Sequence, residues 1–313
     1  MEDKIIVLNQ LKREDLFDTF YWKKQVGKRF VLQISKGLVA EASWFAHYKE
    51  DGNLQDFTIE LSSMSKCPIN CTFCGATSLD STPKYLSAEQ IFSQANFVLQ
   101  DYLKKCNNKD EVLKKLFISF YGIGETSLIA DTILKSIELI KNKYPTSHFN
   151  IATMGAKPNE FEKFASIPDL ITLQLAIYHP LDSEAKKIFV GHKNYSIDTI
   201  LLNLNKFMKK NTLARIRINY VLLDKFNDDT ETLELLIKKL KNNQLDLSRI
   251  AIKLSYLNNT VTSIENKLER PANEKYDALK KFLEKKEINC YLFGTKENIF
   301  ISCGQLISNC VDK

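Results

Sequence analysis

Short apolar runs alternate with amphipathic stretches over most of the chain. Runs rich in β-branched and aromatic residues predict strands at 57–61, 116–121, 149–153, 170–177, 216–222 and 250–254. The stretches between them predict helices at 88–105, 129–143, 160–165, 197–209, 230–241 and 273–286. Such alternation is typical of right-handed βαβ units with a parallel sheet. Six units are two short of a closed eight-stranded barrel, so we predict the α/β class with a partial (β/α)6 barrel.

The first 55 residues follow a different pattern. We predict a short helix at 13–21, a basic turn at 23–29, strands at 30–34 and 39–45, and a polar turn at 47–55. We therefore expect a small N-terminal cap over 1–55 and the barrel over 56–313. The barrel part ends with a short strand at 289–293 and a tail that contains Cys303-Gly304-Gln305-Leu306.

The composition of the 313 residues is that of a soluble globular protein, with 44% hydrophobic and 26% charged residues. No apolar run approaches the roughly 20 residues that a membrane span needs, and the acidic N-terminus does not look like a signal peptide. We therefore expect a cytoplasmic protein without membrane contact. The formal net charge of +6 permits a polyanionic partner but does not require one, since many lysines lie beside acids on predicted helices.

Three of the seven cysteines, Cys67, Cys71 and Cys74, lie within eight residues. They directly follow the first predicted barrel strand, where parallel barrels assemble their active sites. Their spacing suits three corners of a cubane iron–sulfur cluster, and the lack of a matching fourth cysteine leaves one iron open to a small molecule. A structural zinc site with Cys106 as the fourth ligand and a set of unligated thiols are the alternatives.

The second predicted strand ends in Gly122-Ile123-Gly124-Glu125. Glycines at the end of a strand allow another group to approach the backbone closely, and a neighbouring carboxylate can accept hydrogen bonds from a bound ammonium group. We therefore treat Gly124 and Glu125 as candidate ligand-binding residues.

The C-x3-C-x2-C run, with Phe73 before its last cysteine, resembles the cluster motif of the radical S-adenosylmethionine (radical SAM) superfamily. This resemblance implies a [4Fe-4S] cluster held by the three cysteines. It also implies SAM bound at the open iron, with Gly124 and Glu125 near its amino group. A reductant such as flavodoxin or ferredoxin would supply the electron, and the same resemblance implies the partial barrel.

Three further elements narrow the resemblance: the Cys303-Gly304-Gln305-Leu306 tail, the Gly124-Glu125 step, and residues 221–223 followed by Asn227-Asp228. Together they look like the RlmN/Cfr-type adenosine C-methyltransferases, which modify adenine in rRNA or tRNA. The resemblance implies that Cys303 first accepts a methyl group from one SAM. The deoxyadenosyl radical from a second SAM then activates this methyl group for addition to the base.

The same resemblance assigns further residues. It implies that Glu41 removes the adenine proton, although a surface glutamate is an alternative at that position. Thr153 and Asn258 fall where the family contacts SAM, but Ala152 and Met154 replace two serines of the family pattern beside Thr153.

Two departures from the family pattern stand out. Glu60 occupies the position of a second cysteine that resolves the covalent intermediate, and a carboxylate cannot form the required disulfide. Either Cys290 or Cys310 takes that role, or the reaction has changed. The cap is also short for an RNA-binding domain. The cap contains four cations in its predicted basic turn: Lys23, Lys24, Lys28 and Arg29. They either contact phosphates of a nucleic acid or are simply exposed to solvent.

Three functional hypotheses follow. The leading one is a C-methyltransferase with Cys303 as methyl carrier, acting on an RNA adenine or another sp2 carbon. The second is a repurposed radical SAM enzyme whose deoxyadenosyl radical abstracts hydrogen directly from a small-molecule metabolite, a nucleotide or a peptide. The third is an iron–sulfur protein that binds RNA without catalysis.

Overall fold

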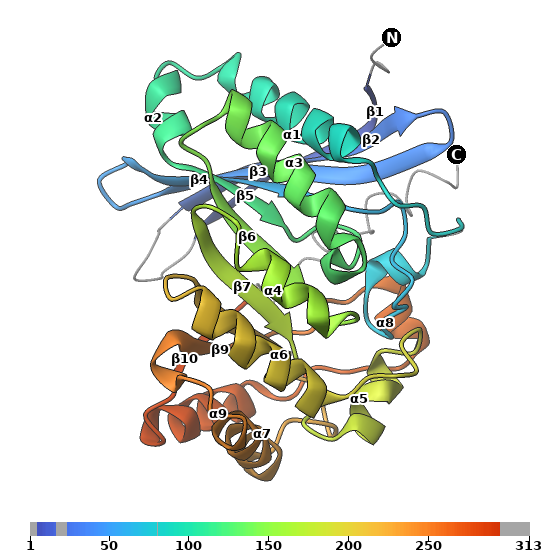
Figure 1. Ribbon diagram of the computed structural model, residues 1–313, viewed down its shortest axis with the longest axis vertical. Helices are drawn as coiled ribbons and strands as arrows, with labels where there is room; N and C mark the ends of the chain where they lie inside the picture. The colour runs from blue at the N-terminus through green and yellow to red at the C-terminus, as the bar shows by residue number, and fades with distance from the viewer. Residues whose placement is uncertain (1–4, 17–23, 80, 295–313) are drawn as a thin grey trace.

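The computed structural model describes residues 5–16, 24–79 and 81–294 and contains one curved sheet of ten strands in sequence order (Figure 1). The first four strands pair antiparallel, and every pairing from β4 to β10 is parallel. The strands are β1 (Ile6–Leu16), β2 (Lys24–Ser35), β3 (Leu38–Tyr48), β4 (Leu54–Leu61), β5 (Leu116–Phe120), β6 (His148–Thr153), β7 (Leu170–Ala176), β8 (Arg215–Val221), β9 (Ile250–Ser255) and β10 (Asn289–Phe293).

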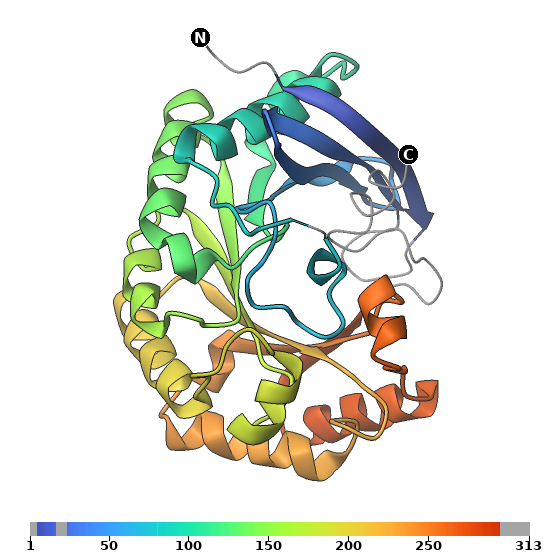
Figure 2. The ribbon, with the colours of Figure 1, turned by 90° about the vertical axis from the view of Figure 1, so that its right-hand side faces the viewer.

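Nine helices are described, and the longer ones line the outside of the curved sheet (Figure 2). They are α1 (Ala88–Leu103), α2 (Lys109–Lys114), α3 (Ala130–Lys143), α4 (Phe161–Phe164), α5 (Asp182–Ile188), α6 (Ile197–Lys210), α7 (Thr230–Asn242), α8 (Val261–Glu265) and α9 (Asn273–Lys285). Alternate aliphatic residues of the strands, such as Ile59, Ile118 and Ile216, are fully buried in one core with the apolar faces of the helices. None of the described helices combines the length and the apolar content needed to cross a membrane.

The predicted fold class is confirmed, since β4 to β10 with their helices form a partial barrel. The six predicted strands and six predicted helices match the observed elements to within a few residues. The short strand at 289–293 is β10, which extends the parallel sheet beside β9. The short helices α2, α5 and α8 were not predicted, because each contains at most one large buried apolar side chain, whereas the equally short α4 contains two phenylalanines.

The N-terminal predictions were partly wrong. Residues 13–16, predicted as helix, form the end of β1 and pair with β2, and residues 24–29, predicted as a turn, belong to β2. Pairing with a neighbouring strand outweighs the local helical pattern there. The rest of the predicted helix, at 17–21, lies outside the described residues. The division of the chain at residue 55 stays a prediction; β3 pairs with β4 across it.

Candidate active site

The three cysteines of the predicted cluster motif lie on a long loop that follows β4, at the C-terminal end of the parallel strands. This cyan segment lies within the ring of strands and helices (Figure 2). Cys67, Cys71 and Cys74 are half-buried and form no disulfide. We call residues 62–79 the cysteine loop.

Segments from much later in the chain hold the first half of the cysteine loop. The amide of Thr72 donates to the carbonyl of Ile188 at the end of α5 (3.0 Å), and the amide of Gly191 donates to the carbonyl of Ile69 (2.7 Å). A Cβ atom at Gly191 would lie 2.0 Å from the carbonyl oxygen of Pro68. Only glycine therefore allows this close approach.

The second half of the cysteine loop is held from the other side, by the segment that begins at Thr260 and includes α8. Thr260 donates its hydroxyl to the carbonyl of Phe73 (2.8 Å), and Asn266 donates its amide to the carbonyl of Thr72 (3.0 Å). Phe73 also packs edge-on against Tyr178, with 5.0 Å between ring centroids. The loop is therefore fixed before any ligand binds.

Burial raises the pKa of Cys67, Cys71 and Cys74, so the three thiols are protonated in the ligand-free chain. Metal binding at these positions must release protons. Within the described residues, no three His, Cys, Asp or Glu side chains surround one point suitable for a single metal ion. Both alternatives stay open: a single zinc ion would need a fourth ligand beside the three cysteines, whereas a cluster shares its irons among several thiolates.

The glycine step after β5 packs tightly against the start of the cysteine loop. The amides of Ser63 and Met64 both donate to the carbonyl of Ile123 (2.8 and 3.1 Å). Gly124 has φ +132°, and a Cβ atom there would lie 2.1 Å from Oγ of Ser63. The cysteine loop, through Ser63 and Met64, therefore makes the close approach that Gly124 allows.

The carboxylate of Glu125 is buried and joins the end of β5 to the end of β6. Its Oε1 accepts from the amide (3.1 Å) and hydroxyl (2.6 Å) of Ser127 and from the hydroxyl of Thr153, while Oε2 accepts from the amide of Met154 (2.8 Å). Burial raises the pKa of Glu125, and these hydrogen bonds partly offset that rise. Each carboxylate oxygen has about two acceptor positions, and Oε2 accepts only the Met154 amide, so one position on Oε2 remains for a ligand.

The remaining predicted cofactor residue, Asn258, is exposed between β9 and α8. Its backbone carbonyl accepts from the hydroxyl of Ser263 (3.1 Å), and this connection leads to Thr260 and the cysteine loop. Glu125 and Thr153 are in direct contact, whereas Asn258 reaches the site only through its loop. Cys303 and Cys310 lie outside the described residues.

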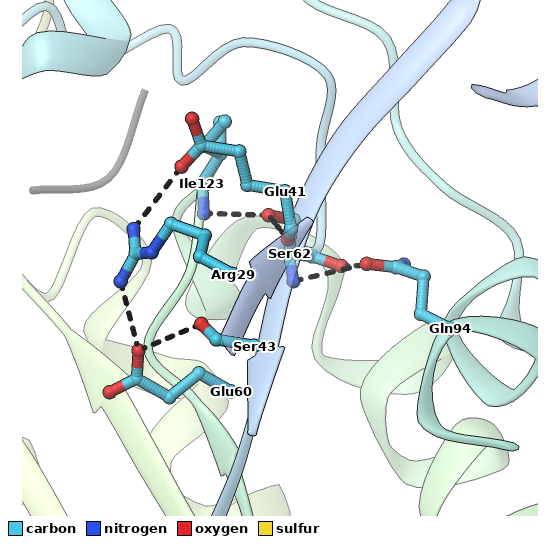
Figure 3. Close-up of polar contacts among 7 residues, drawn as sticks. All are labelled: Arg29, Glu41, Ser43, Glu60, Ser62, Gln94 and Ile123. Atoms are coloured by element: carbon cyan, nitrogen blue, oxygen red, sulfur yellow. Dashed lines mark hydrogen bonds and ion pairs between the residues drawn. The ribbon is translucent and has the colours of Figure 1, made fainter. Parts of the chain in front are cut away.

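Glu41 and Glu60 share one arginine (Figure 3). Nη1 of Arg29 lies 3.2 Å from Oε2 of Glu41, and Nη2 lies 3.3 Å from Oε2 of Glu60. Glu60 also accepts from the hydroxyl of Ser43 at 3.5 Å. Glu41 is only 2% exposed, so the alternative of a surface glutamate is wrong.

Backbone contacts fix Glu41 beside the cysteine loop. The hydroxyl of Ser62 donates to the carbonyl of Glu41 (2.6 Å) and accepts from the amide of Ile123 (3.0 Å). Gln94 holds both the amide and the carbonyl of Ser62. The Glu41 charge also contributes to the raised pKa of Cys74, after burial. The structure thus anchors Glu41 to Ser62, the first residue of the cysteine loop.

The prediction that the basic segment at 23–29 exposes its cations is wrong for Lys28 and Arg29. Lys28 and Arg29 are both buried, and Nζ of Lys28 lies 3.1 Å from Oδ1 of Asp101. Neither side chain is available to phosphates at the surface. Lys24 starts β2, and Lys23 lies outside the described residues. Cys290 is a poor candidate for the resolving thiol, because its Sγ faces the carbonyl of Lys280 in α9 on the outer side of the sheet (3.6 Å).

A row of polar side chains crosses the inner face of the sheet, and the sequence analysis did not predict it. Register pairs Arg29 with Ser43, Ser43 with Glu60, and Glu60 with Ser119. Ser119, Asn150, Gln174, Arg217, Lys253 and Tyr291 continue this inner row through β5 to β10. The interior of a closed barrel is usually filled by branched aliphatic residues. The signal was a single polar or charged residue at an inward-facing position of each otherwise largely apolar strand.

Comparisons with known proteins agree with this geometry. No family model matches the chain. The dual-specificity RNA methyltransferase RlmN of Wigglesworthia glossinidia brevipalpis is 31% identical over 192 residues, which cover 59% of this chain and about half (49%) of that relative. The probable RlmN of Fervidobacterium nodosum is 26% identical over 318 residues, covering 97% of this chain and 85% of the relative. The chain is thus similar in sequence to RlmN-type methyltransferases.

A solved structure supports the fold of this RlmN-like chain. The crystal structure of a radical SAM methyltransferase from Sphaerobacter thermophilus superposes with a TM-score of 0.73 over 95% of this chain and 80% of that one, at 17% identity. The predicted resemblance and the partial radical SAM barrel are therefore confirmed. The relatives are enzymes, and their names support the methyltransferase interpretation.

Proposed function

We propose that this RlmN-like chain is a radical SAM C-methyltransferase that acts on an sp2 carbon of an adenine base and uses Cys303 as methyl carrier. One observation carries the proposal. A chain similar to RlmN over nearly its whole length has a three-cysteine loop at the C-terminal ends of the strands of a partial barrel. We call this end, with the cysteine loop and residues 122–125, the mouth of the barrel. Because the relatives are named RNA methyltransferases, RNA is the first substrate to test.

The residues at the mouth fit the cofactors of such an enzyme. Cys67, Cys71 and Cys74 would hold a [4Fe-4S] cluster, since they are soft donors on a loop that is already fixed. Four residues at the ends of β5, β6 and β9 would contact SAM: Gly124, Glu125, Thr153 and Asn258. When bound, the cluster and SAM supply an organic radical that can abstract hydrogen.

Glu41 would accept the proton that the substrate carbon loses. Arg29 fixes the position of its side chain, and the Ser62 hydroxyl, at the start of the cysteine loop, fixes its backbone. A carboxylate held in place on the inner face is suited to act as a general base.

Methyl-labelled SAM provides the test. Protein reconstituted anaerobically with iron and sulfide, then reduced with dithionite, should convert SAM to 5′-deoxyadenosine. Mass spectrometry should find one added methyl on Cys303, and the label should then move to RNA. The Cys303→Ala variant should keep its cluster and methylate nothing. Purified protein that contains zinc and no inorganic sulfide would overturn the proposal.

Glu60 favours a second candidate function, the repurposed enzyme whose radical acts directly on a metabolite, nucleotide or peptide. Glu60 replaces the resolving thiol and is held by Arg29 and Ser43, so it belongs to an organised site. Unmethylated Cys303 together with 5′-deoxyadenosine formation would support this function. The Glu60→Cys variant should turn over faster if only a thiol has been lost, and unchanged turnover would indicate a different route.

A further inference from the structure

Two cations of the inner row have no acidic partner among the residues that the structure describes. They are Arg217 in β8 and Lys253 in β9. None of the ion pairs in the described part of the chain involves either side chain. The nearby carboxylate of Glu60 binds Arg29 instead. Buried charges without a partner are costly and are usually retained where a ligand or substrate completes them.

Lys253 is the more deeply buried of the two, with 8% of its surface exposed. Its one hydrogen bond within the described residues runs to Oε1 of Gln174 at 3.5 Å, the upper limit for such a contact. Its Nζ lies 3.6 Å from the centroid of the Phe293 ring. The aromatic face holds the ammonium group in place but does not neutralise it.

Arg217 lies beside Lys253 on the same face of the sheet. Register places Arg217 opposite Ala251 and Lys253 opposite Asn219, so the two cationic side chains are diagonal neighbours. The guanidinium lies 5.8 Å from the ring centroid of Tyr291 and contacts the hydroxyl of Tyr121. Aromatic side chains from β10 thus contact both cations.

We propose that Arg217 and Lys253 form a subsite inside the barrel for a compact oxyanion of the substrate, a phosphate or a carboxylate. The guanidinium offers a planar pair of donors that matches either anion, and the ammonium adds a point charge. The role of this anion in the reaction rests on the proposed function, but its binding does not require turnover.

The charges of the inner row favour an anionic ligand over a neutral one. Arg29 already binds both carboxylates, Glu41 and Glu60, at 3.2 and 3.3 Å. Arg217 and Lys253 lie close enough to repel each other: burial lowers the pKa of Lys253 most, the charge of Arg217 lowers it further, and the charge of Glu60 only opposes this shift. A neutral base would leave that repulsion in place, whereas an oxyanion removes it.

The experiment is anaerobic titration calorimetry on the full-length chain with inorganic phosphate, adenosine 5′-monophosphate, adenosine and acetate. We expect the monophosphate to bind at least 10-fold more tightly than adenosine. Arg217→Gln and Lys253→Gln should each reduce phosphate affinity about 10-fold, and Glu60→Gln should increase it. Lys238→Gln, an exposed lysine of α7, is the matched control and should change nothing.

The outcomes separate the two anion sources and the two proposals. Tighter binding of phosphate assigns the subsite to a nucleotide phosphate, and tighter binding of acetate assigns it to a carboxylate. Unchanged affinity in both glutamine variants overturns the subsite. Arg217→Lys and Lys253→Arg keep the charge and should retain most of the binding if a glutamine variant fails to fold. If the wild-type chain cleaves SAM but binds none of the anions, the subsite proposal is wrong and the methyltransferase proposal is unaffected.

Discussion

The mouth of the barrel and its inner row are built in different ways. At the mouth, backbone amides and short side chains hold the cysteine loop from two sides, and Glu125 accepts four hydrogen bonds. In the inner row, one arginine binds two carboxylates, and two further cations have no acidic partner among the described residues. Hydrogen bonds within the chain thus hold the mouth in place, whereas part of the inner row contains charges without an opposite partner.

This difference suggests a division of labour. The mouth contains the features through which the chain resembles its relatives, and cofactor binding needs a rigid frame. The inner row contains Glu60, Arg217 and Lys253, charged side chains that face one another. A substrate must complete such a group, so we expect the inner row to set substrate choice. Substitutions at the mouth should therefore abolish chemistry or reduce stability, whereas those of Arg217 and Lys253 in the inner row should change binding or even raise stability.

The largest effect should come from the cysteine loop. Cys71→Ser removes one thiolate donor, so cluster content and 5′-deoxyadenosine formation should fall at least 100-fold. Iron and sulfide assays with chromatography of the nucleoside measure both. Cys106→Ser is the matched control, since this half-buried cysteine lies outside the loop and should leave both values unchanged. Full activity in Cys71→Ser would show that the mouth does not hold the cofactor.

The satisfied half of the inner row should behave like a structural element. Arg29→Met leaves Glu41, which is 2% exposed, and Glu60 without their cation. Loss of one partner of a buried ion pair costs about 3–5 kcal/mol, and we expect a decrease of that size in the free energy of unfolding. Urea denaturation measures it, and Arg29→Lys should lose less. A loss below about 1 kcal/mol would mean that water already screens both carboxylates.

Packing at the mouth predicts a somewhat smaller effect. Gly124→Ala places a Cβ 2.1 Å from Oγ of Ser63 at a φ of +132°, so we expect a loss of about 2–4 kcal/mol in unfolding free energy. Gly52→Ala is the matched control. Gly52 also has positive φ, but no atom lies within 4 Å of its added Cβ, so it should cost only about 1 kcal/mol. Equal losses would show that backbone strain, not packing, governs the mouth.

The same difference explains what the sequence could predict. Cys67 to Cys74 and Gly122 to Glu125 are contiguous, so their spacing alone indicated the mouth. The role of Gly191 was not visible, because the carbonyl that it must avoid belongs to Pro68, more than 100 positions earlier. The inner row was hidden for a similar reason. Arg217 and Lys253 become neighbours only through strand register, and β2 had been predicted in part as a turn.

The unsatisfied half of the inner row should reduce stability in a pH-dependent way. Burial lowers the pKa of Lys253 from its ordinary value of 10.5 to about 7, with Arg217 adding to the shift and Glu60 opposing it. Below pH 7 both folded and unfolded chains bind this proton, so the full cost of the buried charge is present. Between pH 7 and 10.5 the unfolded chain binds more protons, so stability rises with pH and the cost disappears.

Lys253→Met should therefore stabilise the chain most at low pH. We expect a gain of about 2 kcal/mol in unfolding free energy at pH 6 that shrinks steadily towards pH 10. This gain is smaller than the full pKa shift of Lys253 would give, since solvent screens charges near the partly exposed Glu60. Urea denaturation across this pH range provides the measurement, and Lys238→Met should show no such trend. A loss of stability in Lys253→Met at pH 6 would mean that the ammonium group is already satisfied. The inner row would then be as complete as the mouth, and the reason to place an anion there would be gone.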